Sequence, residues 1–95
     1  MTNSITLNGN KMTSKEVLHR YLVRKLTLPE YYGNNLDALH DCLTELSEDV
    51  HLDVIHTDRI LHCLDAYGEG FLAVLRDSAD ENTHLTVSFF PGNRE

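Results

Sequence analysis

A series of acidic side chains near the middle of the chain has the residue types and spacing of a catalytic, metal-binding or partner-binding site. Its members, with one histidine among them, are Asp37, His40, Asp41, Glu45 and Glu48. At about 100° per residue they gather along one side of a helix, where like charges four residues apart repel by ~0.2–0.5 kcal/mol per pair. Residues 30–49 contain no Lys or Arg to neutralise them. The stripe is therefore either a solvated acidic face or a surface used to bind something else.

Catalysis and metal binding are the first chemistries to weigh. Asp37, His40 and Asp41 could serve as general acids and bases, but catalytic carboxylates usually lie in clefts, whereas these lie on an open helix face. The sequence has no nucleophile elbow, phosphate loop or HExxH motif. His51 and His56, at the end of a strand, point to opposite faces, and His40 has no second histidine one turn on. The sequence therefore predicts no enzyme, no metal site and no cofactor.

The elements that position the stripe follow from the local sequence. Pro29 ends a preceding helix, and Asn34 or Asn35 caps the helix that carries the carboxylates. The apolar side of this helix consists of Leu36, Leu39, Cys42, Leu43 and Leu46. Tyr31 and Tyr32 stand at its entry, and aromatic side chains beside unpaired charge are typical of protein-binding surfaces.

The remaining elements alternate between strands and pairs of helices. Alternation of apolar and polar residues predicts strands at residues 5–7, 50–55 and 85–89. Further helices are expected over residues 13–28 with a Thr13–Glu16 capping box, from a Thr57 or Asp58 cap to a left-handed stop at Gly68, and over residues 71–82. Strands separated by helices favour parallel pairing. The sequence predicts an α/β fold, a small three-stranded parallel sheet with helices packed on it.

One domain is expected over residues 1–95, with loose termini at 1–3 and 91–95. Cys42 and Cys63 lack metal or redox spacing and are expected to be free and buried. The chain has no apolar run of transmembrane length and no signal-peptide pattern, so we expect a cytoplasmic protein without a membrane partner.

Charge is distributed unevenly along the chain. The formal net charge is −7, yet residues 1–29 hold five basic and one acidic residue, and residues 30–95 hold three basic and fourteen acidic residues. An acidic surface disfavours nucleic acid and favours a basic partner. We expect a monomer that binds a basic protein.

The segment LPEYYGNNLDALHDCLTE, residues 28–45, resembles the signature of the barstar family, the intracellular inhibitors of a secreted bacterial ribonuclease. Weaker resemblance continues in the same order through most of the chain. It implies the same α/β fold and an inhibitor that inserts this helix and the preceding loop into the active site of a basic ribonuclease. A carboxylate on a rigid helix can occupy a phosphate position there. The alternative is an acidic interaction or regulatory module whose basic partner is not a nuclease.

The resemblance also implies roles for individual positions. Asp41 matches the family's central aspartate and Asp37 its neighbour one turn earlier, while the last helix should add Asp77, with Glu81 one turn on. The other expected binding residues are Tyr31, Gly33, Asn35, Leu36, Ala38, His40, Thr44 and Glu45. The chain departs from the family at three places: His40 and Leu46 replace tryptophans, and Asp77 replaces glutamate. Each departure trims the contact surface.

Overall fold

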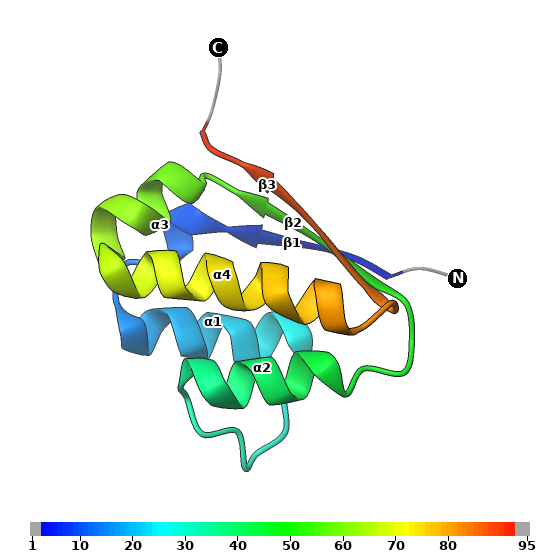
Figure 1. Ribbon diagram of the computed structural model, residues 1–95. Coiled ribbons are helices and arrows are strands. Elements are labelled where there is room, and N and C mark those ends of the chain that lie inside the picture. Colours follow the sequence, from blue (N-terminus) through cyan, green and yellow to red (C-terminus); the bar gives the residue numbers. More distant parts are fainter. Residues whose placement is uncertain (1–2, 93–95) are drawn as a thin grey trace.

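The computed structural model describes residues 3–92 (Figure 1). Its elements are β1 (Asn3–Asn8), a 3-10 helix η1 (Gly9–Lys11), α1 (Lys15–Leu26), α2 (Leu36–Thr44), β2 (Val50–Ile55), α3 (Thr57–Leu64), α4 (Ala66–Glu81) and β3 (Leu85–Phe90). The strands form one parallel sheet in the order β1-β2-β3, which confirms the predicted α/β architecture. No helix in this described range is long and apolar enough to cross a membrane.

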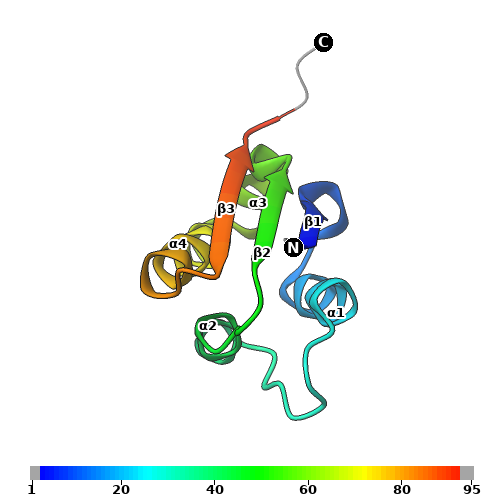
Figure 2. The ribbon, with the colours of Figure 1, turned by 90° about the vertical axis from the view of Figure 1, so that its right-hand side faces the viewer.

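The central strand β2 has the bounds that the sequence predicted. Its inward residues Val50, Leu52 and Val54 are buried, and the residues between them are half-buried on the outer face. Both neighbouring strands pair with it along its six residues. Figure 2 shows α1 and α4 beside the sheet, with α2 below and between them.

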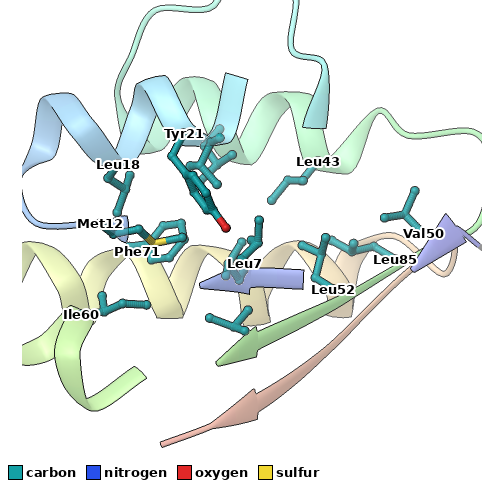
Figure 3. Packing of buried hydrophobic residues seen from close by; sticks show 14 of the residues in the cluster. Leu7, Met12, Leu18, Tyr21, Leu43, Val50, Leu52, Ile60, Phe71 and Leu85 are labelled. Carbon is teal, nitrogen blue, oxygen red and sulfur yellow. The ribbon is translucent and has the colours of Figure 1, made fainter. Parts of the chain in front are cut away.

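The core fills the space between the sheet and this helical layer (Figure 3). Its fully buried side chains include Leu7, Leu52 and Leu85 from the sheet and Leu18, Leu22, Leu39, Leu43, Phe71 and Leu75 from the helices. The hydroxyl of Tyr21 points from α1 toward β1, where it accepts the N–H of Asn8 at 2.9 Å. Cys42 and Cys63 are free, as predicted, but half-buried rather than buried.

The starts of α1 and α3 differ from the sequence-based predictions. Ser14 rather than Thr13 caps α1, because the Oγ of Ser14 accepts a backbone N–H in the first turn at 3.2 Å. Neither Thr57 nor Asp58 caps α3, since both lie within its first turn. The residue before them is His56, which turns the chain with a positive φ of 57° and makes no side-chain cap.

Two positions that were expected to belong to loose termini are held by backbone hydrogen bonds. Asn3 lies in β1 and donates its N–H to the carbonyl of Asp49 at 3.1 Å. At the other end, the N–H of Asp58 donates to the carbonyl of Pro91 at 2.8 Å. The rest of the predicted loose ends, apart from residue 92, lies outside the described residues.

The break between α3 and α4 falls at Asp65, not at Gly68 as predicted. Asp65 turns the chain with a φ of 51°, and Gly68 lies inside α4 with ordinary helical geometry. The glycine is needed for space, because a Cβ there would lie 2.8 Å from the backbone oxygen of Ile60. Gly68 therefore lets α4 approach α3 closely.

Replacing Gly68 by alanine should destabilise the fold by about 1–3 kcal/mol, because a backbone oxygen cannot move away without shifting α3. Gly70→Ala is the matched control. A Cβ at Gly70 would meet only the end of the Leu36 side chain, at 3.1 Å, and removing a glycine from a helix interior contributes about 0.5–1 kcal/mol. Urea unfolding of both variants should separate them; equal free energies of unfolding would contradict this explanation.

Candidate functional site

Asn35 sets the start of α2, the helix that carries the acidic stripe. Its Oδ1 accepts the N–H of Ala38 at 2.7 Å, a cap worth roughly 1 kcal/mol. Asn34 turns the chain into the helix with a φ of 58°, a left-handed conformation that asparagine tolerates. Of the two asparagines that the sequence offered as caps, Asn35 is the cap and Asn34 is the turn.

The side of α2 that faces solvent is acidic because its opposite side is buried. Leu39 and Leu43 are almost completely buried, which turns Asp37 and Asp41 outward. Both aspartates are exposed, and neither carboxylate forms a salt bridge with any residue that the structure describes.

The acidic stripe is shorter than predicted. α2 ends at Thr44, whose hydroxyl donates to the carbonyls of His40 at 2.9 Å and Asp41 at 3.1 Å. Such hydrogen bonds from a side chain to helix carbonyls compete with the backbone hydrogen bonds that would continue the helix. Glu45 occupies the C-cap position and Glu48 lies beyond the helix. The regular helix therefore carries two carboxylates rather than four.

α4 packs against α2 and brings further acidic residues to the same region (Figure 2). The Nε2 of His40 lies 3.1 Å from Oε2 of Glu81, which joins the two helices at the surface. Asp77 is exposed one turn before Glu81, on the same side of α4. The side chains of His40 and Glu81 are 32% and 57% exposed, so the contribution of their ion pair to stability is small, ~0–1 kcal/mol.

Asn82 fixes the relative position of these two helices. Its buried side-chain amide donates to the carbonyl of Leu43, in the last turn of α2, at 2.9 Å and to that of Leu46, just after the helix, at 3.0 Å. Asn82 itself ends α4. The acidic residues of α2 and α4 are thereby carried on a rigid pair of helices. This tie could not be predicted from the sequence, because asparagine after a helix usually indicates only a turn.

The two tyrosines at the entry to α2 have different environments. Tyr31 is 83% exposed, whereas Tyr32 is 7% exposed and belongs to the core. The hydroxyl of Tyr32 lies 2.7 Å from Nδ1 of His19 on α1, and Nε2 of His19 lies 2.6 Å from the hydroxyl of Tyr67 on α4. We call these three residues the Tyr–His–Tyr cluster. The expected aromatic pair on the surface is therefore a single tyrosine.

The cluster is a buried polar network that sequence reasoning missed. Burial, with smaller contributions from Tyr67 and Cys42, raises the pKa of Tyr32 far above its usual range, so the phenol stays neutral. The available signal was a histidine on the buried side of α1, next to Leu18 and three residues before Leu22. A polar side chain at such a position must find a partner inside the fold.

The predicted binding residues all reach the surface. The exposed ones are Tyr31, Gly33, Asn35, Asp37, Asp41, Glu45, Asp77 and Glu81. The half-buried ones are Leu36, Ala38, His40 and Thr44. These residues lie on α2, on the loop before it and on α4, the arrangement expected of a single binding surface. Their contact with a partner stays a prediction.

Positive charge within the described part of the chain does not neutralise this region. The three ion pairs among the described residues each join a histidine to a carboxylate: His40 with Glu81, His51 with Asp53, and His84 with Asp49. No lysine or arginine among residues 3–92 forms one. No group of three or more His, Cys, Asp or Glu side chains within that range is placed to hold a metal ion.

Fold and surface together define a small α/β protein whose acidic face is built on two packed helices. The family model of Barstar, described as the barnase inhibitor, matches residues 2–91, and the chain belongs to this family. The family's description is that of an inhibitor and not of an enzyme, as the sequence predicted.

A relative from Bacillus subtilis (strain 168) is named "Putative ribonuclease inhibitor YrdF". It is 55% identical to this chain over 40 residues, which cover 42% of this chain and 44% of the relative. The match thus spans less than half the length of that protein.

Proposed function

We propose that this chain inhibits a basic ribonuclease by occupying its active site with α2 and the loop before it. The observation that carries the proposal is the exposed acidic face of α2 and α4, which no lysine or arginine in residues 3–92 neutralises by an ion pair. Membership of a family described as barnase inhibitors supports it, as does the name of the relative.

The chemistry of a ribonuclease site explains why this face suits it. Such a site uses cationic side chains to hold the phosphate of RNA, and a carboxylate can accept the same charge-assisted hydrogen bonds. Asp41 lies on the exposed side of a helix whose other side is locked in the core, so little conformational freedom is lost on binding. Tyr31, 83% exposed in the free chain, offers an aromatic side chain to bury in the interface.

The same face also suits a basic partner that is not a nuclease. This alternative shares the acidic surface and the electrostatics, and differs in the identity of the protein bound. An inhibition assay and a capture experiment together separate the two functions.

We expect the chain, added in equal amount, to stop RNA cleavage by barnase, and the Asp41→Ala variant to be a much weaker inhibitor. Immobilised chain should also retain a basic ribonuclease from the host that encodes it, and immobilised Asp41→Ala should not. If barnase cleaves RNA at its full rate and no ribonuclease is retained, the proposed function is overturned. Retention of a different basic protein through Asp41 would support the alternative.

A further inference from the structure

We propose that His19 and Tyr67 are positioning residues for the binding face: acting through Tyr32, they hold the loop of residues 27–35 in the conformation that presents Tyr31 and starts α2. The consequence for affinity rests on the proposed function. The claim about the loop itself concerns the free chain and is testable without a partner.

Three separate elements meet at the ring of His19. The ring is 2% exposed, and both of its nitrogens are engaged, by Tyr32 from the loop and by Tyr67 from α4. The Tyr32 hydroxyl also lies 3.4 Å from the carbonyl of Asn35, the cap of α2. One continuous chain of polar contacts thus runs from α4 through α1 to the start of the acidic helix.

Donor and acceptor roles in this chain can be assigned by elimination. A neutral imidazole has one N–H and one lone pair. If Nδ1 of His19 donates to the Tyr32 oxygen, the Tyr32 hydroxyl is free to donate to the Asn35 carbonyl, and Tyr67 donates to Nε2. In the opposite tautomer the Tyr32 hydroxyl donates its proton to Nδ1 of His19, so it cannot donate to the Asn35 carbonyl. The first arrangement makes the most hydrogen bonds, and it requires the Tyr67 hydroxyl.

The loop has few other attachments. Its ends turn with positive φ at Thr27 and Asn34, and Pro29 has no N–H to donate. A hollow of about 540 Å³ opens between α1 and the loop, bounded on the loop side by Asn34. Figure 2 shows this segment projecting below the helices that it connects. Tyr32 is the one buried residue of the loop, and half-buried Leu28 packs against the core near the start of the loop. The Tyr32 side chain is therefore the main tie between the later part of the loop and the body of the molecule.

Protonation of His19 would disturb this arrangement. Burial lowers the pKa of His19, and a second ring N–H would need both tyrosine oxygens as acceptors. The charged and titratable groups around the cluster are Lys15, Glu16 and Arg20 of α1, Cys42 of α2, and the two tyrosines themselves. Lys15 lies over the Tyr67 ring, with its Nζ 4.9 Å from the ring centroid, and disfavours a further positive charge.

The sign of the pH effect follows from that lowered pKa. When the loop opens, His19 loses Tyr32 and becomes more accessible, so its pKa moves back toward the ordinary 6.5, while in the closed loop burial keeps the pKa lower. Closure is therefore fully favoured above pH 6.5 and weakens as the pH falls below that value, until the closed form is protonated too.

Hydrogen exchange of the free chain tests the proposal directly. Tyr67→Phe and Tyr32→Phe each remove one hydroxyl and should lower the protection factors of the loop amides by about three- to tenfold. Tyr21→Phe is the matched control, because it removes a buried tyrosine hydroxyl whose hydrogen bond is to Asn8 of β1 and not to the cluster. Protection in β2 reports global unfolding and corrects for it. If Tyr67→Phe opens the loop no more than Tyr21→Phe does, the proposal is overturned.

A pH series and an affinity measurement complete the test. Loop protection in the wild type should fall below pH 6.5, and His19→Gln, whose amide supplies a donor and an acceptor that do not titrate, should lose this step. Kd for barnase should rise in Tyr67→Phe in inverse proportion to the fraction of molecules whose loop is closed, which the protection factors give. A loop that is open in a large fraction of molecules with Kd unchanged would refute the positioning role alone. If the wild type neither inhibits barnase nor retains a ribonuclease, the proposed function is refuted, and the role of the cluster in the loop is not.

Discussion

Asp41→Ala is expected to lose most of the chain's affinity for a basic ribonuclease while keeping its fold. In the complex the carboxylate would be buried against cationic groups, and removing one member of such a pair leaves the other unpaired. That costs about 2–5 kcal/mol, or roughly 30-fold to several-thousand-fold in Kd. In the free chain the carboxylate is exposed, forms no salt bridge with any described residue, and lies one turn from both Asp37 and Glu45.

The stability of this variant should be unchanged or higher by a few tenths of a kcal/mol, because repulsion at i,i+4 is relieved. Titration calorimetry with barnase and thermal unfolding measure the two quantities on the same samples. Asp58→Ala on α3 removes an equal charge from an exposed site outside the face and should bind almost normally. Normal binding by Asp41→Ala would place the centre of the interface elsewhere.

Association with a basic nuclease should speed up by a factor of about 10–10³ when the ionic strength is lowered from physiological to 0.01 M. The net charge of −7 creates an attractive field, and the screening length grows from ~8 Å to ~30 Å over this change. Dissociation should change much less, because contacts within the complex are screened weakly.

Stopped-flow association rates at several salt concentrations measure the effect. Asp37→Asn removes a charge from the face and should reduce the salt dependence. Arg24→Gln removes a positive charge from the exposed basic side of α1 and so makes the chain more negative. It should alter the salt dependence of association less. An association rate that stays constant across this range of salt would exclude electrostatic steering.

Much of the fold was predictable, because burial on one face leaves a periodic trace in the sequence. The alternation of Val50, Leu52 and Val54 with polar residues marked β2 to the residue. Helix ends were less predictable. Positive φ is expected at glycine or asparagine, yet His56 and Asp65 adopt it here, where tertiary packing determines the path of the chain.

The candidate site was predictable to the extent that it is local. Leu39 and Leu43 mark the buried side of α2, so the exposure of Asp37 and Asp41 followed from spacing alone. The contacts that hold the site together are not local. His19 meets tyrosines 13 and 48 residues away, and no local pattern indicates which polar side chains will be partners across such separations.

The acidic face draws on both halves of the chain, with β2 between α2 and α4. A ribosome that has completed α2 has made Asp41 but neither Glu81, which pairs with His40, nor Asn82, which ties α4 to the end of α2. In the proposed role, the growing polypeptide would therefore complete its inhibitory surface only after α4 has emerged and folded onto α2.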